Sequence, residues 1–469
     1  MKRTAVILGL TILSVPGSRA ADLPPQRYTK APAIQVYDWT GFYIGANAGV
    51  GVSRDPGSVM LNTNPSVGTS STIGGAGAIG GGQIGYNVQS SNLVLGLEAD
   101  IQGADIKDDR TCTLACLTGT SARYNQQLDW FGTVRGRAGL ATGGVLGYVT
   151  GGFAYGGVQT DNRLTIFNGS SFHFDGMRSG WTAGSGLEAS LGGPWTAKVE
   201  YLYIDFGSQG ATHPVGGGAM ATSSVDMREH IFRAGLNYRF GQNQVAVSEP
   251  TARWQGLYAG ANAGAAIAFN PSSSLLNAGN FIEAQERYNL SPQGFIGGGQ
   301  FGYNWQTGSL VLGLETDIQG SLQRNGGACL LNCEQGALIL NQDQRMDWLG
   351  TTRARLGYAA GSSLFYATGG LAYGNLQTHV SEVFPSTSPV NATFAHTLTG
   401  YAAGAGIESA FGMFGPHWSA KTEYLYVDLG SVTDRYGIGV ITIDHALTTH
   451  VSEHIFRAGL NYHFDSTGP

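Results

Sequence analysis

The sequence has few charged residues and no marked excess of either sign. Asp, Glu, Lys and Arg make up 12% of its 469 residues, about half of the ~25% that is usual in soluble domains. The 26 basic side chains form no cluster after the first few residues. Because proteins that bind nucleic acid carry a clustered basic face, the sequence predicts no nucleic-acid partner.

Long hydrophobic runs are also missing, and the chain offers no stretch of the ~18 apolar residues that a transmembrane helix needs. An apolar segment at 5–15 follows Lys2 and Arg3 and precedes the small residues Ser18 and Ala20. This order is typical of a secretory signal peptide. We therefore predict a signal peptide at 1–20 and an exported mature chain.

Cysteine is scarce, and the four cysteines form two matched pairs, Cys112 with Cys116 and Cys329 with Cys333. Thiols of exported proteins tend to oxidise, so we predict a disulfide within each pair. A zinc site would require four ligands, and neither pair has a further Cys or His nearby. No metal site and no other cofactor are expected.

Glycine is abundant, with 73 residues against a usual share of ~7%. The glycines keep no three-residue period and only 15 prolines accompany them, which excludes collagen, while 42% hydrophobic residues argue against disorder. Strings such as IGGGQ at 79–83 lack the Lys-Ser/Thr ending of a phosphate-binding loop. We interpret them as sites of close strand packing.

The chain repeats itself almost end to end at an offset of about 215 to 224 residues. WTGFYIGANAG at 39–49 returns as WQGLYAGANAG at 254–264, and EHIFRAGLNYRF at 229–240 returns as EHIFRAGLNYHF at 453–464. Such a long period indicates a duplicated domain. The predicted order is a lead at 21–38, one repeat at 39–240, a polar linker at 241–253, a second repeat at 254–464 and a tail at 465–469.

Side chains within the matched segments alternate with a period of two. In the last segment of the first repeat, Phe232 and Leu236 share one face, while Arg233 and Asn237 share the other. This alternation predicts strands with one apolar and one polar face. Eight strands are expected in the first repeat, at 40–52, 78–88, 92–103, 124–140, 145–158, 179–190, 195–206 and 229–240.

The connections between these strands alternate between short and long. Tight turns are expected at QSSN (89–92), ATGG (141–144) and LGGP (191–194), and again at QTGS (306–309) and AGSS (360–363). The other connections have roughly 20 to 25 polar residues. Short turns at one end of an even number of antiparallel strands, with long loops at the other end, are typical of outer-membrane barrels.

The predicted fold is therefore all-β, a transmembrane antiparallel up-and-down β-barrel, with two tandem eight-stranded barrels. One sixteen-stranded barrel is the alternative, since both repeats begin and end on the same side. A soluble β-sandwich fits less well because its loops need not alternate in length.

The quoted segments, together with ADLPPQRYTKAP at 21–32, GGQIGYN at 81–87, DWFGTVRGRAG at 129–139 and EYLYIDFG at 200–207, resemble a known family. It is the group of small alphaproteobacterial outer-membrane proteins, porin-like and opacity-like, with an OmpA-type eight-stranded barrel. The resemblance implies residence in a Gram-negative cell outer membrane and a structural role. This chain differs from the usual members of that family in two ways. It holds two units, and Phe464 is followed by a tail.

The same resemblance suggests partners. They are outer-membrane lipid and lipopolysaccharide, the barrel-insertion machinery, and host, phage or solute contacts made through long loops that face the exterior.

If the apolar faces meet lipid, charged residues of both signs line each lumen. Because an eight-stranded barrel has room only for its own side chains, we predict a salt-bridge network that plugs the lumen, with a gate or narrow ion path as the alternative. The predicted network is Glu98, Asp100, Arg135, Arg137, Glu188, Lys198, Glu200 and Arg233 in the first repeat, and Glu315, Asp317, Arg353, Arg355, Glu408, Lys421, Glu423 and Arg457 in the second.

The function expected from these features is a structural and surface-interaction role. A porin that conducts small solutes through a merged or gated barrel is the alternative. An outer-membrane lipid enzyme would need a constellation such as Ser and His on adjacent strands, and none is repeated in both copies. The chain is therefore expected not to be an enzyme.

Overall fold

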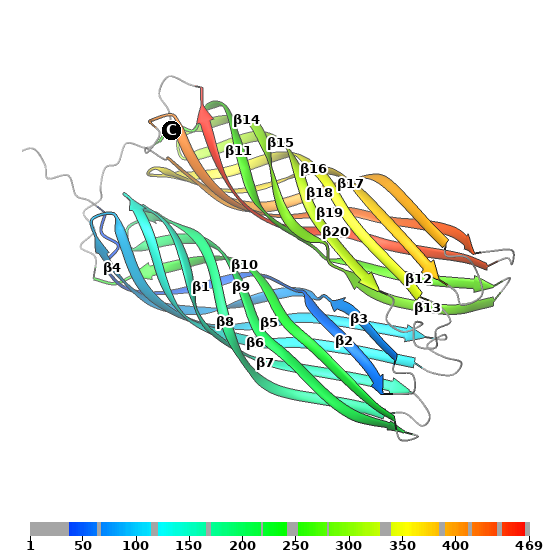
Figure 1. The fold of residues 1–469 in the computed structure, drawn as a ribbon. Coiled ribbons are helices and arrows are strands. Elements are labelled where there is room, and N and C mark those ends of the chain that lie inside the picture. The colour runs from blue at the N-terminus through cyan, green and yellow to red at the C-terminus, as the bar shows by residue number, and fades with distance from the viewer. Residues whose placement is uncertain are drawn as a thin grey trace, which may run out of the picture. The chain divides into compact units, whose positions relative to one another are not determined.

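The computed structural model describes residues 37–62, 67–113, 121–165, 170–216, 219–241, 252–278, 281–328, 339–383, 390–410, 415–438 and 443–464. These residues form twenty β-strands (Figure 1). No helix in the described ranges is long and apolar enough to cross a membrane. The predicted signal peptide, most of the lead and of the linker, and the tail lie outside the described residues.

The first repeat forms a closed ring of eight antiparallel strands. Each strand pairs with the next, and the last returns to pair with the first, Tyr43 lying opposite Arg239. The ring consists of β1 (Gly41–Ser53), β4 (Ala76–Ser90), β5 (Leu93–Thr113), β6 (Ser121–Thr142), β7 (Val145–Thr165), β8 (Ser170–Gly192), β9 (Trp195–Gly216) and β10 (Ala219–Arg239).

The second repeat closes in the same way, and β20 returns to β11 with Tyr258 opposite His463. Its ring consists of β11 (Gly256–Ala268), β14 (Gln293–Thr307), β15 (Leu310–Ala328), β16 (Ile339–Ala360), β17 (Ser363–Val383), β18 (Val390–Ala410), β19 (Trp418–Ile438) and β20 (Ile443–His463). The two closed rings confirm the predicted tandem eight-stranded barrels rather than one sixteen-stranded barrel.

The short turns are also confirmed. Two residues each connect β4 to β5, β6 to β7, β8 to β9, β14 to β15 and β16 to β17. Gly143, with φ 58°, and Gly308, with φ 60°, adopt the left-handed backbone conformation that such tight hairpins require. We call the turn end of each barrel its inner end and the opposite end its outer end, after the usual orientation of such barrels.

The prediction of loops of 20 to 25 residues was wrong in extent, because much of that sequence continues the strands. For example, β5 runs to Thr113 instead of ending at 103, and β10 begins at Ala219 instead of 229. Since ~9–11 residues suffice to cross a membrane, strands of 21 residues such as these project well beyond it on the outer side.

The first connection of each repeat holds a hairpin that the sequence pattern did not predict. It is formed by β2 (Asp55–Asn62) and β3 (Val67–Ile73) in the first repeat, and by β12 (Asn270–Ala278) and β13 (Phe281–Leu290) in the second. In each case the first hairpin strand pairs with the outer half of the last barrel strand. The hairpin therefore extends the barrel wall at its outer end.

Aromatic side chains mark two levels on the outward face. Near the inner end of the first barrel, Trp195 contacts Tyr238, with ring centroids 5.2 Å apart. Eight residues further along the same face of β9, Tyr203 contacts Trp181 at 5.3 Å. Exposed apolar residues such as Leu97, which is 68% exposed, lie on the outward face of the barrel. This arrangement corresponds to two aromatic girdles around a lipid-facing band.

Some glycines on the inward face leave room for tyrosine rings. Gly85 lies directly opposite Tyr43, and a Cβ on Gly85 would come within 2.3 Å of the Tyr43 ring. Gly302 and Tyr258 repeat this arrangement in the second barrel, where a Cβ on Gly302 would come within 2.4 Å of the Tyr258 ring. Each glycine thus lets a tyrosine lie flat across the narrow lumen, which explains part of the glycine content.

Candidate functional site

The lumen of each barrel holds a layer of charged side chains at the depth of the lipid-facing band. In the first barrel, all eight residues of the predicted network point inward and are at most 5% exposed. They come from β5, β6, β8, β9 and β10, so the layer connects strands around the ring.

Arg135 forms the centre of this layer. Its guanidinium donates from Nη2 to Glu98 at 2.5 Å and to Asp100 at 2.9 Å, and from Nη1 to Glu200 at 3.0 Å. Its Nε donates to the Thr133 hydroxyl at 2.9 Å. One side chain of β6 therefore binds carboxylates from β5 and β9.

Two further cations surround the same three carboxylates. Arg233 donates from Nε to Glu200 at 2.7 Å and from Nη2 to Asp100 at 2.9 Å. Lys198 donates to both oxygens of Glu98, at 2.9 and 3.0 Å. Each carboxylate thus has at least two cationic partners, as buried charges require.

Arg137 continues the network toward the inner end. It donates to Glu188 at 2.8 Å and to the Tyr43 hydroxyl at 2.9 Å, and its guanidinium lies 4.0 Å from the centroid of the Tyr148 ring. The Tyr43 hydroxyl in turn donates to Glu98 at 2.8 Å. Tyr43 therefore joins the two parts of the charge layer.

The second barrel reproduces this layer. Arg353 donates to Glu315 at 2.8 Å, to Asp317 at 2.9 Å and to Glu423 at 2.9 Å. The remaining members repeat the contacts of their counterparts, with Lys421 on Glu315, Arg355 on Glu408 and Tyr258, and Arg457 on Asp317 and Glu423.

Each network is neutral, with four cations and four carboxylates. The predicted set in each repeat contains one Lys, three Arg, one Asp and three Glu, and the structure brings all of them together. Every one of these charges lies within 4 Å of an opposite charge. Among the described residues, no group of three or more His, Cys, Asp or Glu side chains is arranged to hold a metal ion.

Apolar side chains close the lumen on both sides of the charge layer, and sequence reasoning missed them. On the outer side of the first barrel, a buried cluster fills the lumen. Its members are Ile79, Ile106, Leu128, Phe131, Ala154, Val158, Leu202, Ile204, Phe206, Met227 and Ile231. On the inner side, Trp39 packs with Val94, Leu146 and Tyr148, and its indole nitrogen donates to the Gly143 carbonyl at 3.2 Å.

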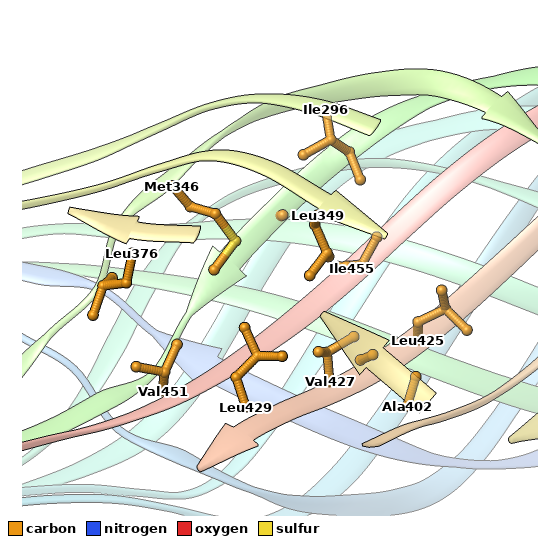
Figure 2. Packing of buried hydrophobic residues seen from close by; sticks show 12 residues of the cluster. Ile296, Met346, Leu349, Leu376, Ala402, Leu425, Val427, Leu429, Val451 and Ile455 are labelled. Carbon is orange, nitrogen blue, oxygen red and sulfur yellow. The ribbon is translucent and has the colours of Figure 1, made fainter. Parts of the chain in front are cut away.

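The second barrel has the same two closures. Figure 2 shows the outer cluster, in which Leu349, Leu425 and Ile455 come from three strands and are fully buried. Trp254 occupies the inner position with Val311 and Leu364. The sequence EYLYIDFG could have indicated these layers. In it, the inward residues Leu202 and Ile204 alternate with outward tyrosines, so this part of the strand has no polar face.

The predicted disulfides fall at the edge of what the structure describes. Cys116, Cys329 and Cys333 lie outside the described residues, and for Cys112 only its backbone position near the outer end of β5 is described. Both disulfides therefore stay predictions.

A known family matches each half of the chain, and single known proteins match about half of it. The family described as "Outer membrane protein beta-barrel domain" matches residues 28–240 and again 244–464. The 31 kDa outer-membrane immunogenic protein of Brucella melitensis is 35% identical over 248 residues, which cover 51% of this chain and 100% of that protein. The 22 kDa outer membrane protein of Rhizobium leguminosarum is 28% identical over 190 residues, which cover 40% of this chain and 70% of that protein.

Among solved structures, Neisserial surface protein A aligns with 43% of this chain and 98% of its own length. Its sequence identity is 14% and its TM-score is 0.23, so this likeness carries no argument about function. The sequence matches each cover about half of this chain, as a tandem duplication requires.

Proposed function

We propose, from the premise that this chain belongs to the family of outer membrane protein beta-barrel domains, that its two barrels are closed scaffolds that conduct no solute. The chain is an outer-membrane protein, and the printed names of its relatives describe outer-membrane proteins too. The single observation that carries the proposal is the apolar cluster that fills each lumen beside a fully paired charge layer.

The energetics of the lumen support this proposal. An ion that entered the charge layer would have to separate pairs such as Arg135 and Glu98, and separating a buried pair leaves an uncompensated charge that costs ~3–5 kcal/mol. It would then have to cross the apolar cluster, where few polar side chains replace its water; Gln102, opposite Phe131, and Glu229, opposite Ile204, are buried at that level. Among the described residues, one void at the outer end of the first barrel, between Gln126, Ser223 and Met227, has a volume of about 30 Å³, room for about one or two water molecules.

The scaffold would act through what it presents outside the membrane. The long strands carry β-structure beyond the outer aromatic girdle in both barrels. The matched Brucella proteins are named immunogenic, and a projecting, ordered rim offers such a surface here. Its partners would be outer-leaflet lipid and lipopolysaccharide around the girdle, the barrel-insertion machinery during assembly, and host, phage or solute molecules at the loops.

We expect the purified full-length protein to produce no conductance steps in planar lipid bilayers. The matched comparison is a variant with Leu349, Leu425 and Ile455 replaced by serine, which opens the apolar cluster of the second barrel while leaving its charge layer intact. Both proteins should be verified as folded by their change in gel mobility on heating. Reproducible, uniform steps from the wild-type protein would contradict the proposal, and steps altered by Arg135→Ala would support the gated path instead.

A further inference from the structure

The outer mouth of the second barrel holds a Ser-His-Glu arrangement that lies outside both charge layers. Ser274 Oγ lies 2.5 Å from His445 Nε2. Glu382 Oε2 lies 3.3 Å from Nδ1 of the same ring, and the Tyr436 hydroxyl lies 2.8 Å from that nitrogen. Ser274 is on β12, Glu382 on β17 and His445 on β20, so the fold brings together three residues that are far apart in the sequence.

These contacts match the roles of a nucleophile, a base and an orienting acid. With a proton on Nδ1, the imidazole donates toward Glu382 and Tyr436, and Nε2 is left to accept the Ser274 proton. This is the tautomer in which a histidine activates a serine for attack on a carbonyl carbon. The second carboxylate oxygen of Glu382 is buried without a hydrogen-bond partner, so the carboxylate is directed at the ring by one oxygen only.

The fold does not require polar residues at these positions. Strands of the two repeats align without gaps here, since β10 and β20 both have 21 residues, as do β7 and β17. The counterparts of Ser274, Glu382 and His445 in the first repeat are Val59, Leu164 and Ala221. The first repeat thus has apolar residues at the aligned positions, while the second has a serine, a glutamate and a histidine.

The arrangement lies close to the outer rim, where a substrate can arrive. Glu382 is the last residue but one of β17, and His445 is the third residue of β20. Ser274 is 6% exposed, so a substrate reaches it when these strand ends open, and strand ends are the least stable parts of a sheet. Apolar neighbours Val380 and Leu447 pack with Tyr436 beside the three residues.

We propose that the outer mouth of the second barrel is a serine esterase site for carboxylic esters with a short acyl chain. Ser274 Oγ attacks the ester carbonyl carbon and gives its proton to His445 Nε2. The bond from the carbonyl carbon to the alcohol oxygen breaks, and His445 returns the proton to the departing alcohol. Water then attacks the acyl-serine by the same proton path, releasing the acid and restoring Ser274. Apolar Val380 and Leu447 would receive the acyl chain.

The test is covalent labelling of the full-length protein, refolded in detergent, with a fluorescent fluorophosphonate. The serine oxygen attacks phosphorus and fluoride leaves, so the label reports an activated serine directly. We expect a single labelled site that peptide mass analysis places at Ser274. Labelling should disappear in Ser274→Ala and fall by about 10³-fold in His445→Gln, since triad members act as a unit.

Ser272→Ala is the matched control, because Ser272 is two residues away on the same face of β12 and bonds Thr449 instead of a histidine. It should label like the wild-type protein. A second measurement uses p-nitrophenyl butyrate, for which the wild-type protein should release an initial burst of one p-nitrophenolate per chain. Folding of each variant is checked by heat-dependent gel mobility.

An unlabelled wild-type protein that is fully folded, or labelling that persists in Ser274→Ala, would overturn the proposal. Neither result depends on conductance, so the esterase site and the closed scaffold stand or fall separately. A positive result would also overturn the sequence-based expectation that the chain is not an enzyme.

Discussion

Replacing Arg135 by alanine is expected to lower the free energy of unfolding of the first barrel by about 3–5 kcal/mol. The substitution removes a cation that donates hydrogen bonds to Glu98, Asp100 and Glu200 at once. All three carboxylates stay buried at the depth of the lipid-facing band, where water does not replace the lost partner. The cost is therefore the penalty of uncompensated buried charge rather than the modest value of a surface ion pair.

Urea unfolding in detergent, followed by tryptophan fluorescence, measures this change. Arg353→Ala should produce an equal loss in the second barrel, because Arg353 makes the same contacts. Arg345→Ala is the matched control, because Arg345 is on β16, the strand that also carries Arg353, but faces outward. Its side chain is 47% exposed and lies 3.6 Å from Asp347. Exposed pairs are worth ~0–1 kcal/mol, and a loss that small for Arg135→Ala would mean that the charge layer does not hold the barrel together.

Gly85→Ala is expected to destabilise the first barrel by about 2–4 kcal/mol, although it adds a single methyl group. The new Cβ would lie 2.3 Å from the Tyr43 ring. Tyr43 would have to move, and its hydroxyl would then lose its bonds to Glu98 and Arg137. The cost thus combines overpacking in the lumen with the loss of buried hydrogen bonds.

The same strand provides the control. Gly82 faces outward, and the nearest atom to a Cβ there is 3.7 Å away, so Gly82→Ala should change stability by no more than about 1 kcal/mol. The pair Gly302→Ala and Gly299→Ala repeats the comparison in the second barrel, with nearest atoms at 2.3 and 3.8 Å. Equal unfolding midpoints for Gly85→Ala and Gly82→Ala would show that Tyr43 is not held against the glycine.

The membrane-spanning part of the fold was predictable because lipid imposes a strict contrast between the two faces of a strand. Leu236 faces outward and Asn237 inward, and this alternation, with the short turns, was enough to predict eight strands and the inward charges. The structure brings all sixteen of those charges together in two layers. Their partners follow less directly from sequence, since Arg135 and Glu200 are far apart along the chain.

The outer halves of the strands could not be predicted in this way. Beyond the outer girdle polar residues occur on both faces, so residues such as Thr448 and Thr449 do not continue the alternation even though β20 runs through them. The hairpin of β12 and β13 was missed for the same reason. The apolar closures were missed because Leu202 and Ile204 lie among outward tyrosines, so the strand lacks a polar face.

The Ser274 and His445 pair shows a different limit. These residues lie on the adjacent strands β12 and β20, which is the arrangement that an enzyme was expected to need. An enzyme was expected to repeat such a pair in both copies, whereas the first repeat has Val59 and Ala221 at the aligned positions. Duplication preserves what the barrel needs to fold, so features unique to one copy are where function can diverge.

The central claim, that each repeat is a complete and closed barrel, is tested most directly by refolding residues 21–240 and 252–469 as separate fragments in detergent. Folded barrels keep their structure in the gel until they are heated, so each fragment is run with and without boiling. We expect each fragment to shift its mobility on heating without the other. A shift that occurs only for the full-length chain would contradict it and would indicate one merged, sixteen-stranded pore.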